Sequence, residues 1–214
     1  MQLKKLHKEI DSLHDLYGDS SLSSIYGAGC IENPSVLLMF MNPTAKNISS
    51  HKKWTGLRAP WLGTKNIWSL LRDLGFITDD YFNTISALRP EEWTTAFSSE
   101  IYSHLAAKSI YITNLAKCTQ LDARPLKDDV FRKYLDVVKK EISIVNPKHI
   151  ITFGNQVSSI LLSKPVSVSA YAGIKKETLT ITGKVFDVYP TYYPVGHGRM
   201  NQPLAIKRIK AILK

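Results

Sequence analysis

The chain has 214 residues, of which 44% are hydrophobic and 21% charged, and it contains only two cysteines. This composition is typical of a folded protein with its own core. It excludes a disulfide framework and any zinc or iron–sulfur site built from four cysteines of this chain. The formal net charge of +10 predicts attraction to polyanions, so we expect nucleic acid or a phosphorylated ligand as partner, with a merely basic enzyme as the alternative.

Residues 1–18 predict an amphipathic N-terminal helix, packed on a single domain that spans residues 1–214. Leucine and isoleucine recur there at helical spacing, and Gly18 ends the pattern. The same stretch is too charged for the core of a signal peptide, and no run approaches the ~20 apolar residues that span a bilayer. We therefore expect a cytoplasmic protein with reduced thiols and no membrane contact.

The first strand is predicted over residues 36–41, an unbroken apolar run of the kind buried on both faces in a parallel sheet. Asn42 and Pro43 end it, because proline has no N–H to give to the sheet. Ligands of open α/β sheets bind beyond the carboxyl ends of the strands, so Asn42 is expected at the lip of a site. The alternative is that Asn42 and Pro43 form only a turn.

Residues 47–65 show no periodicity and interleave cations with aromatic residues, as in Lys52, Lys53, Arg58 and Trp61. A long irregular segment just after a strand end is more often a functional loop than filler. Thr64 is expected to cap a helix over residues 65–74.

The second half continues the alternation of strands and helices. A second buried strand over residues 109–114 also ends on an asparagine, Asn114. Further helix starts are expected at residues 78–80 and 90–92. The remaining predicted elements are a helix over 127–145, a strand over 147–154, a helix over 156–162, a hairpin or loop over 167–184, a strand over 185–190, its exit loop over 191–199 and a helix over 204–213.

This pattern predicts the α/β class, a three-layer α/β/α sandwich around a mostly parallel four-stranded central sheet. Stacking the strands in parallel brings Asn42, Asn114, Gly154 and the loop from Tyr193 to His197 to one edge, with residues 54–61 able to fold over it. An asparagine amide offers donors and an acceptor that match the edge of a nucleobase, and aromatic rings suit stacking on one.

The residues from about 24 to 201 resemble the uracil-DNA glycosylase superfamily. The resemblance rests on Tyr26-Gly27-Ala28-Gly29 with the strand and motif at 36–45, on residues 58–71, on 112–118, on 146–155 and on 190–194. Met41-Asn42-Pro43 is closest to the Asn-Pro form of the single-strand-selective and mismatch-specific branches.

The resemblance implies an enzyme that flips a uracil or related damaged base out of DNA, single- or double-stranded, and hydrolyses its glycosidic bond. Asn42 would position the water, Asn114 would read the base edge and Trp61 would stack on the base. The remaining implied roles are substrate contacts by Met41 and Thr44, DNA contacts by Lys52, Lys53 and Arg58, a phosphate clamp by Arg199 and a wedge by Met200. We expect a monomer that uses no cofactor and no metal.

Several positions depart from the family pattern. Tyr193 occupies the place of the histidine that stabilises the uracil anion, so either its hydroxyl or His197 would donate instead. Phe40 and Thr44 replace glycines that commonly flank the first motif, and Cys30 and Cys118 cannot supply the iron–sulfur ligands of the thermostable branch. Two other functions stay open: a catalytically silent nucleic-acid-binding protein, and a hydrolase of free nucleosides or nucleotides.

Overall fold

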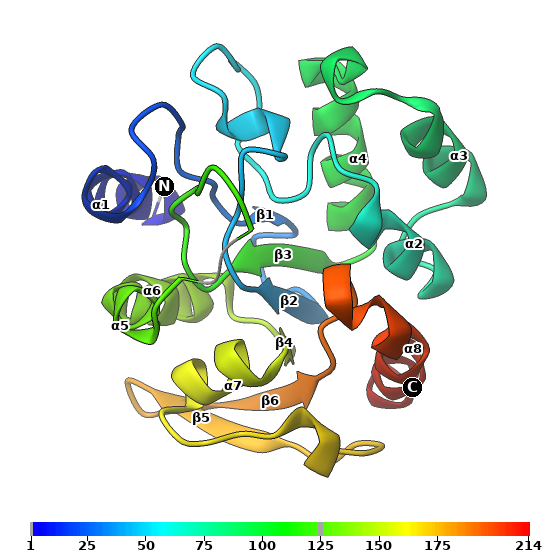
Figure 1. Ribbon diagram of the computed structural model, residues 1–214. Coiled ribbons are helices and arrows are strands. Elements are labelled where there is room, and N and C mark those ends of the chain that lie inside the picture. Colours follow the sequence, from blue (N-terminus) through cyan, green and yellow to red (C-terminus); the bar gives the residue numbers. More distant parts are fainter. Residues whose placement is uncertain (1, 124–125) are drawn as a thin grey trace.

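The computed structural model describes residues 2–123 and 126–214 and is built around one sheet with the strand order β1-β3-β2-β4-β6-β5 (Figure 1). The four inner strands run parallel, and β1 and β5 are antiparallel to their neighbours. The strands are β1 (Ala28–Gly29), β2 (Val36–Phe40), β3 (Ile110–Asn114), β4 (His149–Phe153), β5 (Glu177–Ile181) and β6 (Lys184–Thr191). The predicted α/β class and parallel centre are confirmed.

The prediction of four strands was wrong, because the sheet has one further strand at each edge, β1 and β5. β1 is only two residues long, which is too short to show a strand pattern. β5 forms a hairpin with β6, and the two residues between them, Thr182 (φ 46°) and Gly183 (φ 82°), both have the positive φ of a type I′ turn. Of the segment predicted as a hairpin or loop, residues 177–181 form a hairpin strand with β6, whereas the part before them is a 3-10 turn (Val168–Ala170) and loop, so each alternative holds for part of it.

Helices cover both faces of the sheet (Figure 1). One layer contains α1 (Gln2–Tyr17), α5 (Asp128–Lys133), α6 (Leu135–Val145) and α7 (Asn155–Leu162). The other contains α2 (Asn66–Asp73), α3 (Asp79–Ala87), α4 (Thr95–Ala107) and α8 (Gln202–Ile212). Single 3-10 turns are η1 (Ile48–Ser50), η2 (Pro90–Glu92), η3 (Val168–Ala170) and η4 (Gly196–Asn201). Of the helices described, none is long and apolar enough to cross a membrane.

Three predicted helix boundaries differ from the structure. The helix expected over 127–145 is broken at Tyr134, whose N–H bonds the carbonyl of Phe131, three residues back. The start expected at Pro90 forms only η2, and the longer helix α4 begins after Thr94, whose hydroxyl accepts from the N–H of Phe97. Thr64 does not cap α2, because its hydroxyl donates to the carbonyl of Trp61 at 2.8 Å.

The alternation of side chains along the central strands sets which residues face which layer. Val36, Leu38 and Phe40 of β2 pack in the core with α2, α4 and α8, whereas Leu37 and Met39 pack in the opposite core. Phe40 is directly beside Asn114 in the parallel register of β2 and β3. Asn114 is therefore expected on the side of Phe40, at the carboxyl edge of the sheet.

A buried polar cluster lies on the opposite face of the sheet, below the loop that follows β3. The Nζ of Lys117 is 2.7 Å from Oε2 of Glu141, and it also donates to Thr113. Tyr111 donates its hydroxyl to the same carboxylate at 2.8 Å. Gly27 must be a glycine here, because a Cβ would lie 2.1 Å from the Tyr111 hydroxyl and 2.5 Å from the Glu141 carboxylate. The cluster thus ties the strand exit, α6 and the β1 segment together.

We predict that Glu141→Gln lowers the free energy of unfolding by about 3–5 kcal/mol, because it leaves the Lys117 ammonium buried without a counter-charge. Urea denaturation measures this loss. The matched control is Glu9→Gln, which removes an exposed ion pair with Lys140 and should cost less than about 1 kcal/mol. Equal losses in the two variants would contradict the structural role given to the buried pair.

Candidate active site

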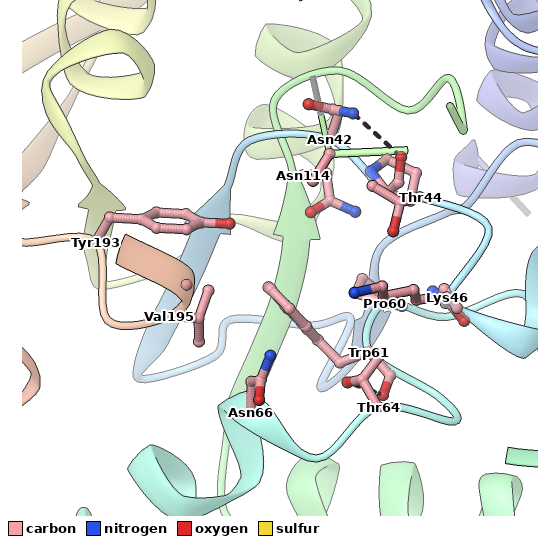
Figure 2. Close-up of a pocket in the computed structure, with 14 residues that line it drawn as sticks. Asn42, Thr44, Lys46, Pro60, Trp61, Thr64, Asn66, Asn114, Tyr193 and Val195 are labelled. Atoms are coloured by element: carbon pink, nitrogen blue, oxygen red, sulfur yellow. Dashed lines mark hydrogen bonds between the residues drawn. The ribbon is translucent and has the colours of Figure 1, made fainter. Parts of the chain in front are cut away.

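A cavity of about 240 Å³ opens at the carboxyl ends of β2 and β3. Figure 2 shows its walls, which come from the β2 exit, the loop before α2, the end of β3 and the loop after β6. The residues that line it are Asn42, Pro43, Thr44, Lys46, Asn47, Pro60, Trp61, Thr64, Asn66, Asn114, Ala123, Tyr193, Val195 and Gly196. Segments far apart in sequence therefore meet at the place where a ligand of an α/β sheet is expected.

Two carboxamides lie near one another on one wall of the cavity (Figure 2). Asn42, two residues past β2, donates its amide to the carbonyl of Pro43 at 3.1 Å, which fixes the side chain and leaves its oxygen free of that bond. Asn114, the last residue of β3, is buried, yet within the described chain its amide has no hydrogen-bond partner. The Asn114 side chain borders the cavity, so its two donors and its acceptor are available to a ligand.

Trp61 forms the wall opposite the asparagines and is held in an unusual conformation. Its φ of 68° is rare for a bulky residue. Its carbonyl accepts hydrogen bonds from the Thr64 hydroxyl at 2.8 Å and from the Trp68 indole at 3.3 Å. The indole N–H of Trp61 itself is buried and lacks a partner among the described residues. Strained backbone and an unpaired donor are features that cluster at functional sites.

A second asparagine-centred network fixes the segment that precedes Trp61. The side chain of Asn47 donates to the carbonyl of Ala59 at 2.8 Å and accepts from the N–H of Ser49 at 3.1 Å. The hydroxyl of Tyr102, on α4, donates to the carbonyl of Pro60. These buried bonds tie the Ala59–Trp61 backbone to η1 and α4, so the aromatic wall is rigid.

Tyr193 comes from the loop after β6 and points its hydroxyl toward the side of Asn114 (Figure 2). Its ring packs edge-on to Phe40, with 6.4 Å between the ring centroids. Burial disfavours the phenolate and raises the pKa of Tyr193 to about 12. The hydroxyl is therefore protonated at neutral pH and can donate a hydrogen bond into the cavity.

Phe40 forms a common base under these walls. Its ring stacks on Phe153 with 4.4 Å between centroids and meets Trp61 edge-on at 5.0 Å. It is fully buried, in a position where the family resemblance leads one to expect a glycine. Phe40 and Phe153 do not line the cavity themselves: this aromatic floor lies behind Trp61 and Tyr193 and holds their rings in place.

The structure brings only part of the predicted site together. Asn42, Thr44, Trp61, Asn114 and Tyr193 all line the cavity. Met41 does not, because the side-chain alternation turns it toward the core of α5, α6 and α7. The side chain of His197 lies outside the described part of the chain, although its backbone belongs to η4.

The five predicted DNA-contacting residues lie away from the cavity lining. Arg58 pairs with Asp11 of α1 at 3.4 Å and lies over the ring of Tyr26, 4.2 Å from its centroid. Its charge is thus engaged with the N-terminal helix. The other four are exposed: Lys52, Lys53, Arg199 and Met200, the last of which is 90% exposed. Arg199 lines a groove that adjoins the cavity through Asn66, Val195 and Gly196.

Sequence reasoning missed the lining residues Lys46, Asn47 and Asn66, whereas Val195 lies in the loop from Tyr193 to His197 that was expected at this edge. A signal existed for Asn47, a polar residue five positions after Asn42 in the same strand-exit loop. Asn66 gave none, because it is the first residue of α2 and reaches the cavity only through the placement of that helix. Within residues 2–123 and 126–214, no cluster of three or more histidine, cysteine or acidic side chains is placed to hold a metal ion.

The arrangement suits a small planar ligand with a polar edge. The Asn114 amide offers two donors and an acceptor, the Tyr193 hydroxyl adds a donor, and Trp61 and Pro60 supply an apolar wall. Lys46, exposed at the rim, adds positive charge. Among the described residues no carboxylate lines the cavity, so no acidic side chain in that lining can act as a general base.

Comparison with known proteins identifies a family. The model of the uracil DNA glycosylase superfamily matches residues 26–214, nearly the whole chain. A search of curated proteins finds no match. The matched range starts at Tyr26, just before the Gly27 that approaches the buried Glu141 cluster, and it includes every residue that lines the cavity.

We predict that Tyr193 remains protonated up to pH 10.5, where an ordinary tyrosine with a pKa near 10 is mostly ionised. NMR of the protein labelled with ¹³C at the tyrosine Cζ measures this, with the Tyr193 signal assigned from Tyr193→Phe. A signal that moves with a midpoint near pH 10 would mean that the hydroxyl is exposed to solvent. Tyr192, the half-buried neighbour, is the internal comparison.

Proposed function

The chain belongs to the uracil DNA glycosylase superfamily, and on that premise we propose that it is a DNA glycosylase that hydrolyses the glycosidic bond of uracil or a closely related base. Family membership supports the glycosylase class of activity. The observation that carries the finer proposal is the unpartnered amide of Asn114, which shares one cavity with Asn42, Trp61 and Tyr193.

Base recognition is assigned to Asn114. The pairing edge of uracil presents an N–H between two carbonyl oxygens, so a carboxamide can accept from the N–H and donate to one carbonyl. The Asn114 amide borders the cavity and has no competing bond to any described residue, so its donors and acceptor can pair with the base. Trp61 and Pro60 would lie against the base, and reaching this cavity requires that the nucleotide leave the helix stack.

Leaving-group stabilisation is assigned to the Tyr193 hydroxyl. When the glycosidic bond breaks, negative charge develops on the base and positive charge on the sugar. A neutral donor aimed at the developing anion is worth about 3 kcal/mol in a water-poor site. Burial keeps this hydroxyl protonated, since it raises the pKa of Tyr193 to about 12. The tyrosine would then fill the role of the histidine that the family commonly has.

Water positioning is assigned to Asn42. Its amide nitrogen is held by the 3.1 Å bond to the Pro43 carbonyl, which leaves the amide oxygen free to accept a hydrogen bond from a water. An amide does not take a proton as a carboxylate does, so the water attacks a sugar that is already cationic. We therefore expect slower turnover than in an enzyme with an acidic residue at this position.

The proposed substrate is DNA, and the charge of the chain supports it. The formal net charge is +10, and the rim of the cavity carries Lys46, with Arg199 in the adjoining groove. Such charges neutralise phosphates and give an affinity that falls as salt rises. A cytoplasmic monomer remains our working expectation for the protein.

We predict that the purified protein releases uracil from an oligonucleotide, and that Asn114→Ala lowers the single-turnover rate by about 100-fold or more because a transition-state contact is lost. Asn42→Ala should lower the rate as well. Cleavage of the product strand at alkaline pH measures the abasic site. The matched control, Asn83→Ala, changes an exposed asparagine of α3 and should leave the rate unchanged.

Salt-dependent DNA binding without release of uracil, hypoxanthine or xanthine would instead support the catalytically silent reading, which the Tyr193 substitution motivates. Release from free deoxyuridine as fast as from DNA would support a nucleoside hydrolase. Either outcome would overturn the glycosylase proposal.

We also predict that Tyr193→Phe lowers the rate by about 100-fold while leaving oligonucleotide affinity nearly unchanged, since the hydroxyl acts mainly on the developing anion. The rate of the wild type should show no loss from ionisation of Tyr193 between pH 7 and 10, because its pKa is about 12. His197→Ala is the parallel variant. A rate that titrates near pH 6.5 and is abolished by His197→Ala would transfer the donor role to that histidine.

A further inference from the structure

A second cavity, of about 280 Å³, lies between the η3–β5 loop and α8, on the other side of the loop that carries Tyr193. Tyr192 lines this cavity and the next residue, Tyr193, lines the first, so one short segment separates the two. The side chains that matter below are Ser169, Tyr171, Tyr192, Leu204, Lys207 and Arg208. No step assigned above uses them.

Arg208 is a buried cation that lacks a counter-ion. Its side chain is on α8, and the residue is only 4% exposed. One guanidinium nitrogen donates to the carbonyl of Lys175, but Nε and Nη1 have no partner among the described residues. No carboxylate in the described chain pairs with it, and burial lowers the pKa of the guanidinium from its usual value. A desolvated charge in this state is stabilised by any anion that enters the cavity.

The nearby carboxylates are already paired, so they do not compete for Arg208. Glu177 accepts from the Tyr171 hydroxyl at 2.6 Å and also pairs with Lys164. Asp187 pairs with Lys176 at 2.7 Å. Lys207, exposed on the cavity wall, adds a mobile cation at the entrance.

Apart from Ser169 and the two cations, the rest of the lining is mostly apolar and aromatic. Tyr171 is fixed by its bond to Glu177 and by two cations: the Nζ of Lys175 is 4.8 Å from its ring centroid and the Cζ of Arg208 is 5.7 Å from it. Tyr192 and the half-exposed Leu204 complete a surface that suits a flat ring. Aromatic faces beside a cation are the combination that binds unstacked nucleotides.

We propose that this second cavity binds a nucleotide unit, with its phosphate held by Arg208 and Lys207 and its base against Tyr171 and Tyr192. The phosphate belongs either to the strand that continues from the reacting nucleotide or to a free nucleotide. The strand alternative rests on the proposed glycosylase function, whereas the site itself does not. Occupancy would order the Tyr192–Tyr193 segment and thereby the first cavity.

The test uses isothermal titration calorimetry on the full chain at low salt with three probes: inorganic phosphate, thymidine monophosphate and a 5′-phosphorylated thymidine tetranucleotide. None contains uracil, and calorimetry reads binding without base release, so failure here is separate from failure of the glycosylase proposal. We expect Arg208→Met to weaken nucleotide binding at least about tenfold, because a charged hydrogen bond is lost.

Matched variants separate binding from structure. Lys207→Gln should weaken binding by about two- to fivefold, whereas Lys210→Gln, on an exposed position of the same helix outside the cavity, should not. Asn83→Ala, on α3 and outside both cavities, should bind the nucleotide as the wild type does. The ligand-free Arg208→Met protein should unfold at the same temperature or a higher one, since an unpaired buried charge is removed.

If the tetranucleotide binds more tightly than the monophosphate, the bound phosphate belongs to a DNA strand. If the two bind equally, it belongs to a free nucleotide. Binding that survives Arg208→Met, or that Lys210→Gln weakens as much as Lys207→Gln does, would overturn the proposal. So would affinity for phosphate alone that neither nucleotide exceeds. If Arg208→Met does not fold, the nucleotide affinities of Lys207→Gln and Tyr192→Leu are compared with that of Lys210→Gln. Affinities equal to that of Lys210→Gln would overturn the proposal.

Discussion

The parallel register of β2 on β3 is the constraint on which the site depends. It places Phe40 directly beside Asn114, so that the last side chain of one strand lies next to the polar end of the other. The ring of Phe40 then meets Phe153, Trp61 and Tyr193. A shift by one residue would exchange the faces of β3 and turn Asn114 into the opposite core. Both the polar wall and its aromatic floor follow from this one pairing.

The opposite face of the sheet supports the same strand end by different means. Thr113, the neighbour of Asn114, and Lys117 of the exit loop both bind Glu141 of α6. There the buried charges of Lys117 and Glu141 are paired with each other, so this cluster fixes the position of the strand end and has no free charge for a ligand. The cavity side differs, because the Asn114 amide borders the cavity with no described partner and the Trp61 indole N–H is buried without one. The Asn114 amide is therefore a group on this side that a ligand can satisfy.

Burial also explains how a tyrosine can stand where the family commonly has histidine. A histidine near its ordinary pKa is partly charged at neutral pH, whereas Tyr193 among Phe40 and Trp61 stays neutral and keeps its proton. The apolar floor that raises its pKa also strengthens the hydrogen bond it can donate. The same reasoning applies to the second cavity, where Arg208 has no counter-ion among the described residues and Tyr192 is also a lining residue. In both proposals desolvation is the cause: it keeps the proton on Tyr193 in one and favours an anion beside Arg208 in the other.

The local pattern determined much of this protein. Apolar runs that end on Asn42 and Asn114 predicted two central strands and their polar ends. The apolar residues that mark a buried strand and the polar residues that end it are adjacent in the sequence, so both could be recognised together. Only the tertiary structure decided the rest. In the folded protein, strand alternation points Met41 toward the opposite core, and Arg58 forms an ion pair with Asp11 of the N-terminal helix. Contacts between distant segments depend on how the loops fold and on which charged side chains come close together. Neither leaves a regular residue spacing in the sequence from which it could be predicted.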